Sequence, residues 1–327
     1  MRPRLIVLAI SLVGIFVQTL GSFASQPEAI TGGITTHIVA PGETLTSIAS
    51  RFGVDPSTIA SDNHLAAVGP LEPGRTLLID NTHIVPATIE AGEIVVNLPQ
   101  RMLFYRDEDH IVAYPIAVGR PTWQTPRGAF TVTWKDANPA WHVPASIRAE
   151  SARKGQELPL VVPPGPRNPL GRFWIGLSLS GIGLHGTPVP TSIYRTVTHG
   201  CIRLQANNIE DLFGRVDIGT PGRIVYEPVL LTSHDSEVYL EVHPDVYGRA
   251  TMSALQQAHE LAARLGLSDR IDWTLATAEI GRRAGIARRV SLDAARVTAA
   301  SPGSTVRNGR TGRRAASMPQ ASRSAPR

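Results

Sequence analysis

Cys201 is the only cysteine in this chain of 327 residues, and it lies in the sequence Thr198-His199-Gly200-Cys201. It cannot form a disulfide bond within the chain, and an unpaired cysteine in a secreted protein is typical of a reactive thiol or an intermolecular link. A buried, inert thiol is the alternative, because free cysteine packs as a small hydrophobic residue. The polar neighbours His199 and Arg203 favour the reactive thiol.

A thiol nucleophile needs a base and hydrogen-bond donors for the oxyanion. His185 and His199 are the nearest histidines before Cys201 in the chain. If residues 199–203 form an extended strand, His199, Cys201 and Arg203 face the same side. Gly200 allows the backbone to approach a substrate, which suits an oxyanion site formed by the Cys201 amide and its neighbour. Arg203 would then offer its guanidinium to a carboxylate.

Two other chemistries use the same residues. A zinc site could take His185, His199 and Cys201 as ligands, since imidazole and thiolate both bind zinc well. The sequence contains no His-Glu-x-x-His motif and no second cysteine, and no fourth ligand is evident. Dithiol redox chemistry within the chain also requires a second cysteine. We therefore expect a site without a metal or an organic cofactor.

A mainly β domain is predicted to position these residues. Between Gly92 and Tyr226 the apolar residues alternate with period two, interrupted by glycine and proline turns. His185 ends one of the predicted strands, because Gly186 and Pro188 force a turn directly after it. The end of a strand in a rigid sheet is a good place to hold a catalytic group. The expected architecture is a sheet sandwich or a small barrel.

Residues 36–80 are predicted to form a separate α+β module. A run of apolar residues at helical spacing is followed by Gly53, which favours the end of a helix. Asp55 and Pro56 then predict the start of a second short helix. The helical run consists of Leu45, Ile48, Ala49 and Phe52. Strands at both ends complete the module.

The first 24 residues are typical of a signal peptide. Arg2 and Arg4 precede an apolar run from Leu5 to Leu20, which is short for a membrane-spanning helix. Small residues follow, and cleavage after Ala24 is expected. An uncleaved N-terminal anchor is the alternative. In both cases the rest of the chain is exported.

The region after the β domain is predicted to be partly helical. In residues 228–300 we expect a C-terminal subdomain that packs on the catalytic sheet, with helices in residues 251–266 and 277–290. Residues 301–327 contain six arginines and no acidic residue. We expect this basic tail to be disordered, with contact to the wall or to lipid as the alternative. It contributes to the net charge of +5, and nothing else in the sequence indicates nucleic-acid binding.

These motifs resemble known families. The segment from His185 to Leu204, with Thr198-His199-Gly200-Cys201 and Arg203, resembles the signature of YkuD-type L,D-transpeptidases, as does "TPRGAFTV". The resemblance covers residues 92–227, and further segments are similar to the ErfK/YbiS group of periplasmic enzymes. Residues 36–80 resemble the LysM module, which binds the glycan of peptidoglycan or chitin.

The resemblance implies a peptidoglycan substrate in the periplasm. Cys201 would attack the carbonyl of meso-diaminopimelate in a tetrapeptide stem and expel D-alanine, with His185 as the base and the Gly186 carbonyl orienting it. An amine of another stem, or of an outer-membrane lipoprotein, would then take the acyl group. His199, Gly200 and Arg203 would shape the oxyanion and carboxylate contacts. A hydrolase on the same fold and a non-catalytic scaffold that binds peptidoglycan are the alternatives.

Overall fold

The computed structural model describes residues 29–66, 69–86, 89–108 and 110–293. The predicted signal peptide, residues 1–24, and the predicted basic tail, residues 301–327, lie outside these ranges. Among the helices within the ranges, none has the length and apolar character needed to span a membrane.

The main sheet contains nine strands within the described residues, and most of them form a closed barrel. Their order is β13-β7-β14-β12-β11-β8-β15-β5-β6, and a further pairing of β6 with β7 joins all of them except β13 into a ring. The strands are β5 (Ile94–Asn97), β6 (Met102–Arg106), β7 (Ile111–Gly119), β8 (Gly128–Ala137), β11 (Phe173–Leu177), β12 (Gly183–His185), β13 (Thr196–Thr198), β14 (Ile202–Leu204) and β15 (Pro221–Val225). The predicted mainly β fold is confirmed.

The long strands β7 and β8 close the barrel because each pairs with different neighbours along its length. The first half of β7 pairs with β6 as far as Pro115, then Ile116 and Ala117 pair with β14, and the last two residues pair with β13. In the same way, β8 pairs with β15 up to Thr131 and with β11 from Val132. The core inside is aliphatic and aromatic, and helix α4 (Ala206–Arg215) covers it with Ile209 and Leu212. The region of the candidate nucleophile, between β13 and β14, is therefore attached to a rigid sheet.

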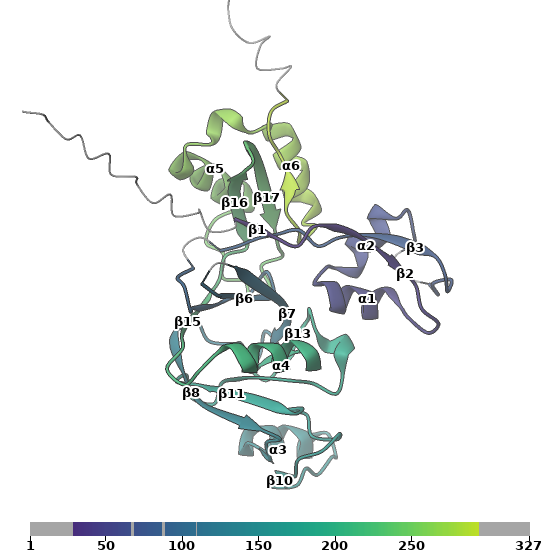
Figure 1. Ribbon diagram of the computed structural model, residues 1–327, viewed down its shortest axis with the longest axis vertical. Coiled ribbons are helices and arrows are strands. Elements are labelled where there is room, and N and C mark those ends of the chain that lie inside the picture. The colour runs from purple at the N-terminus through teal and green to yellow at the C-terminus, as the bar shows by residue number, and fades with distance from the viewer. Residues whose placement is uncertain (1–28, 67–68, 87–88, 109, 294–327) are drawn as a thin grey trace, which may run out of the picture. The chain divides into compact units, whose positions relative to one another are not determined.

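A polar insertion separates β8 from β11. It contains β9 (Trp141–His142), α3 (Ala145–Arg153) and β10 (Val161–Val162), and β9 pairs with β10. Figure 1 shows α3 and β10 next to the ends of β8 and β11. Of the nine residues of α3, only Ser151 is buried. The helix therefore has no apolar stripe that would anchor it, and its polar side chains must supply contacts.

The N-terminal module consists of β2 (Ile34–Ile38), α1 (Leu45–Phe52), α2 (Pro56–Asp62) and β3 (Thr76–Asp80), with β2 and β3 antiparallel. Helix α1 ends at Gly53, whose φ of 73° is in the left-handed region, as the sequence predicts. Asp55 occupies the N-cap position of α2, but its side chain makes no capping hydrogen bond. It binds Arg101 of the barrel instead, at 3.0 Å. The short pair β1 (Ile30–Thr31) and β4 (His83–Ile84) flanks the module in sequence.

The C-terminal subdomain contains strands in addition to the helices that the sequence predicts. It contains a sheet of β16 (Val229–His234), β17 (Glu237–Val242) and β18 (Arg288–Arg289). The predicted helix over residues 251–266 is α5 (Ala254–Leu265), which buries Ala258 and Ala262 but leaves Leu255 and Leu265 exposed.

The helix predicted over residues 277–290 is partly wrong, because α6 (Trp273–Arg282) ends before Arg283, which adopts a left-handed conformation. The following residues turn back to pair β18 with β17. On the way, Ala284 and Ile286 enter the hydrophobic core of the N-terminal module. The C-terminal subdomain therefore packs on that module as well as on the barrel. The short helix η2 (Ser268–Arg270) links α5 to α6, and η1 (Pro190–Ser192) precedes β13.

Candidate active site

A pocket of about 720 Å³ brings together the predicted site residues. Its lining includes Cys201, His185, His199, Thr198 and Arg203. Four of the five tryptophans of the chain also line it, namely Trp123, Trp134, Trp141 and Trp174. An aromatic wall beside a few convergent polar groups is typical of a binding site for a ligand that is partly apolar.

The segment that carries Cys201 is a turn and not the extended strand that the sequence predicts. Strand β13 ends at Thr198 and β14 begins at Ile202, and Gly200 between them has a φ of 110°. Only glycine adopts this conformation readily. Thr198 holds the turn together, because its hydroxyl donates to the Cys201 carbonyl at 2.5 Å and accepts from the Gly200 amide at 3.1 Å. His199 and Cys201 still reach one pocket, but the turn is the reason.

Two residues that the sequence analysis does not identify support this turn. The Thr125 hydroxyl donates to the Gly200 carbonyl at 2.8 Å and accepts from the Gly119 amide at 2.9 Å. The hydroxyl of Tyr247, from the C-terminal subdomain, donates to the Gly119 carbonyl at 2.7 Å. Thr125 lies in the "TPRG" segment that carries part of the family resemblance, so the motif was a signal for it.

His185 is 4% exposed and ends β12, as the sequence predicts. Its Nδ1 lies 2.7 Å from the Gly186 carbonyl oxygen, which can only accept, so Nδ1 carries the proton. Nε2 is thereby left as the nitrogen that can accept a proton. The ring stacks on Trp174, with 5.8 Å between the ring centroids. Burial, and then the charge of Arg203, lower the pKa of His185 to about 4.

Cys201 and Arg203 lie on either side of Ile202, the first residue of β14. Burial raises the pKa of the Cys201 thiol, although the Gly183 amide and the Arg203 charge act in the opposite direction. Arg203 is directly opposite His185 in the parallel pairing of β12 with β14. Its Nε is buried without a hydrogen-bond partner among the described residues, and burial lowers its pKa. A carboxylate in the pocket could satisfy this donor.

His199 is held by a residue that the sequence analysis missed. Its Nε2 lies 2.9 Å from Oε2 of Glu150, which projects from α3. Trp123 packs against the imidazole edge to face, with centroids 4.9 Å apart. Because α3 lacks an apolar stripe, periodicity gave no indication of a helix at this position. Within the described residues no group of three or more histidine, cysteine, aspartate or glutamate side chains is arranged to hold a metal ion.

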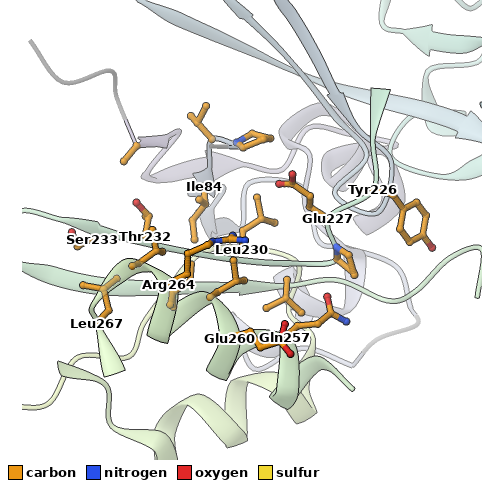
Figure 2. Close-up of a pocket in the computed structure, with 18 of the residues that line it drawn as sticks. Ile84, Tyr226, Glu227, Leu230, Thr232, Ser233, Gln257, Glu260, Arg264 and Leu267 are labelled. Carbon is orange, nitrogen blue, oxygen red and sulfur yellow. The ribbon is translucent and has the colours of Figure 1, made fainter. Parts of the chain in front are cut away.

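A second cavity, of about 590 Å³, lies between α5, β16 and the segment around Ile84. In Figure 2 the side chains of Glu227, Leu230 and Arg264 are drawn among its lining residues. None of the predicted site residues lines it. The candidate site is therefore the pocket at Cys201.

Fold and pocket together define an enzyme-like β-barrel domain with a thiol and an imidazole in one cavity. The family model for the L,D-transpeptidase catalytic domain, YkuD, matches residues 91–225. The model for the LysM domain matches residues 37–80. The resemblance inferred from the motifs is confirmed, and the chain belongs to the L,D-transpeptidase family.

The chain is similar to named relatives and, more distantly, to solved structures. The chain is 32% identical over 274 residues to the probable L,D-transpeptidase ErfK/SrfK of Escherichia coli, covering 81% of this chain and 86% of that protein. It is 35% identical to the probable L,D-transpeptidase YbiS of the same species, covering 52% of this chain and 56% of that protein. Among solved structures, an Enterococcus faecium L,D-transpeptidase matches with 24% identity and a TM-score of 0.34, covering 42% of this chain and 50% of that one.

Proposed function

We propose that the protein is a peptidoglycan L,D-transpeptidase that uses Cys201 as its nucleophile. The observation that carries the proposal is the hydrogen bond from His185 Nδ1 to the Gly186 carbonyl. It makes Nε2 the proton acceptor of an imidazole that lines the same pocket as the only thiol. A positioned base of this kind contributes roughly 10²- to 10⁴-fold to a rate.

In the first half-reaction, Cys201 Sγ attacks the carbonyl carbon of meso-diaminopimelate in a tetrapeptide stem. The thiol proton goes to His185 Nε2 and then to the leaving nitrogen of D-alanine. The products are a thioester and free D-alanine. The Cys201 amide is the candidate oxyanion donor, since the Gly200 amide is already bonded to Thr198. Arg203, whose Nε has no partner among the described residues, is the candidate for the stem carboxylate.

In the second half-reaction an amine attacks the thioester and forms a new amide bond. The amine belongs to another stem peptide or to a lipoprotein lysine. The thioester keeps the free energy of the cleaved amide, so the reaction needs no nucleotide. The four tryptophans of the pocket offer an apolar wall against which the acceptor stem can pack.

The remaining parts of the chain fit a protein of the periplasmic cell wall. We assign residues 1–24 to a signal peptide, 36–80 to glycan binding, 92–227 to catalysis and 228–300 to a C-terminal subdomain. Asn63 supports a stable glycan-binding module, because its side chain donates to the Ile59 and Leu78 carbonyls and accepts from the Leu78 amide. The tail, residues 301–327, is assigned no contact.

Intact-protein mass spectrometry with a tetrapeptide muropeptide tests the proposed chemistry. We expect an adduct on the wild-type protein with the mass of the muropeptide less D-alanine, and none on Cys201→Ala. Addition of a tripeptide muropeptide, which offers an amine but no D-alanine, should discharge the adduct into a cross-linked dimer.

Two outcomes would change the assignment. Discharge to the hydrolysed stem alone, at the same rate with and without the acceptor, would identify a hydrolase. Absence of any adduct on folded protein, together with retained peptidoglycan binding, would leave a non-catalytic scaffold.

A further inference from the structure

Glu150 connects α3 to the candidate active site through charged groups. Its Oε2 accepts from His199 Nε2 at 2.9 Å and also from Arg120. Its Oε1 accepts from Lys154, one helical turn later, at 2.7 Å. Hydrogen bonds from Lys154 and Arg120 lower the pKa of Glu150 to about 2, so the carboxylate is ionised near neutral pH.

This contact determines which nitrogen of His199 can react. A carboxylate accepts hydrogen bonds, so Nε2 of His199 must carry a proton. The other nitrogen, Nδ1, has no hydrogen-bond partner among the described residues. The His199 side chain is 27% exposed and lines the pocket, in contrast to the buried His185. A carboxylate on one nitrogen and a free second nitrogen is the arrangement by which an acid orients a general base and stabilises its imidazolium.

We propose that Glu150 is a positioning residue that holds His199 as the base for the acceptor amine in the second half-reaction. The inference rests on the proposed function. The nitrogen of the neutral amine forms a bond to the thioester carbonyl carbon, and it gives up a proton to His199 Nδ1. The bond from that carbon to Cys201 Sγ breaks with its electron pair on sulfur, and the imidazolium returns the proton to the thiolate.

In this scheme His185 acts in the first half-reaction, with the acyl donor, and His199 acts in the second, with the acceptor amine. His185 is enclosed between Trp174 and the Gly186 carbonyl and lies opposite the positive charge of Arg203. Burial and the neighbouring charge of Arg203 therefore disfavour a positive charge on His185. His199 is hydrogen-bonded to an ionised carboxylate and is partly exposed in the pocket. An incoming amine must lose a proton, so it is better served by His199.

The arrangement also makes the acceptor step depend on the insertion that carries α3. Because α3 buries only Ser151, its hold on the barrel depends on polar contacts such as those of Glu150. Loss of the Glu150 carboxylate would release His199 without removing the hydrogen bonds of His185 or Cys201. We therefore predict that the rate of transfer to the acceptor falls while the rate of acylation does not.

The test separates the two half-reactions in Glu150→Gln. D-alanine release from a tetrapeptide muropeptide reports acylation, and discharge of the adduct by a tripeptide muropeptide reports transfer. We expect transfer to fall by about tenfold or more, as part of what a positioned base contributes. Acylation should stay within about twofold of the wild-type rate. Glu157→Gln, the same change at an exposed position in the same insertion, is the matched control and should alter neither rate.

Two further variants distinguish positioning from a general structural role. Glu150→Asp keeps the charge and should recover part of the lost transfer rate. Combining Glu150→Gln with His199→Gln should lower transfer no further than His199→Gln alone, because both changes remove the same interaction. If Glu150→Gln does not fold, His199→Gln tests the inference instead. We then expect this variant to lose transfer and to retain acylation.

The inference is overturned if Glu150→Gln leaves transfer unchanged, or if acylation and transfer fall by the same factor in the folded variant. Failure of the proposed function is a different result, since the wild-type protein would then form no adduct that has lost D-alanine.

Discussion

Burial acts in opposite directions on the two groups that would exchange a proton in the first half-reaction. It raises the pKa of the Cys201 thiol and lowers the pKa of His185 to about 4. The thiol and the imidazole are therefore both neutral in the free protein near neutral pH. A neutral thiol is less easily oxidised than a thiolate, so this arrangement protects Cys201 in the free protein.

The pH dependence of acylation follows from the His185 pKa. The imidazole accepts the thiol proton only when it is neutral, and it is neutral above about pH 4. We expect the rate of D-alanine release to fall on acidification with a midpoint near pH 4, and not near the ordinary pKa of histidine of about 6.5. Rapid-quench measurement of D-alanine release between pH 3.5 and 7 provides the midpoint.

Arg203→Met is the informative variant for this profile. The charge of Arg203 lowers the pKa of His185, so its removal should move the acid midpoint to higher pH even if the rate also falls. Arg195→Met, at an exposed position, should leave the midpoint where it is. A midpoint near pH 6.5 in the wild type, or one that does not move in Arg203→Met, would exclude His185 as the titrating base.

At the scale of elements, the sequence predicts those that bury an apolar face and misses those that do not. Strand β7 is a nearly continuous apolar run whose last six residues are buried, and the glycine after His185 marks the end of β12. Helix α3 has no apolar face, so neither it nor its Glu150 could be found by periodicity. In α5 the leucines have the right spacing, but Leu255 and Leu265 are exposed, and the buried face of the helix is formed by Ala258 and Ala262.

The turn at residues 199–201 shows a different limit of the sequence. Glycine between two polar residues is compatible with an extended strand and with a turn, and only the partners decide. Thr198, two positions before Gly200, binds the Gly200 amide. Thr125, 75 positions before Gly200, binds the Gly200 carbonyl. The residues that meet in the site were predictable from the motif, while the backbone conformation that joins them was not.

Gly53 ends α1, and we expect its substitution to show how closely the N-terminal module packs on the barrel. It ends α1 in a left-handed conformation, and a Cβ there would lie 2.9 Å from Pro115 Cγ and 3.1 Å from Met102 Sδ. Gly53→Ala should lose about 1 kcal/mol for the conformation, and a further ~1–3 kcal/mol for the contact with the barrel. Chemical denaturation measures the free energy of unfolding.

Gly42→Ala is the matched control for this change. Gly42 has a φ of 83°, similar to the 73° of Gly53, but nothing lies within 4 Å of its would-be Cβ. It should show only the conformational loss of about 1 kcal/mol. Equal losses for the two variants would mean that the N-terminal module does not pack on the barrel as closely as the structure shows.

At the scale of the whole molecule, one buried carboxylate connects three parts of the chain. Glu241 of β17 is fully buried and accepts from the side chains of His83, Gln100 and His243 at 2.8 to 2.9 Å, and from the Ile84 amide at 2.5 Å. His83 also reaches the Gly53 carbonyl with its other nitrogen, at 3.0 Å. The imidazole of His83 therefore links the N-terminal module to the buried carboxylate of β17.

Arg101 provides a second connection of this kind, since it binds Asp55 of the N-terminal module and the Tyr194 carbonyl. Buried charges are retained only where partners compensate them. The N-terminal module, the barrel and the C-terminal subdomain should therefore unfold together, with Glu241 as the group on which this cooperativity depends.

Glu241→Ala tests that expectation. It leaves the four groups that hydrogen-bond to Glu241 without their buried acceptor, and we expect a loss of about 3–5 kcal/mol in the free energy of unfolding. Thermal unfolding, followed by calorimetry, should change from one transition to two as the parts separate. Glu237→Ala, on the same strand but paired with Arg289 at the surface, should have little effect on either quantity.

The pH dependence of this loss has a definite sign. Burial alone would raise the pKa of Glu241, but His83 and His243 outweigh it and hold it at about 2, below the ordinary value of 4.5. A carboxylate with a lowered pKa in the folded state stabilises the fold above pH 4.5, and this contribution disappears as the pH falls towards 2. The difference in stability between wild type and Glu241→Ala should therefore be largest near neutral pH and shrink on acidification. A difference that stays constant down to pH 2 would show that Glu241 contributes through packing rather than through its charge.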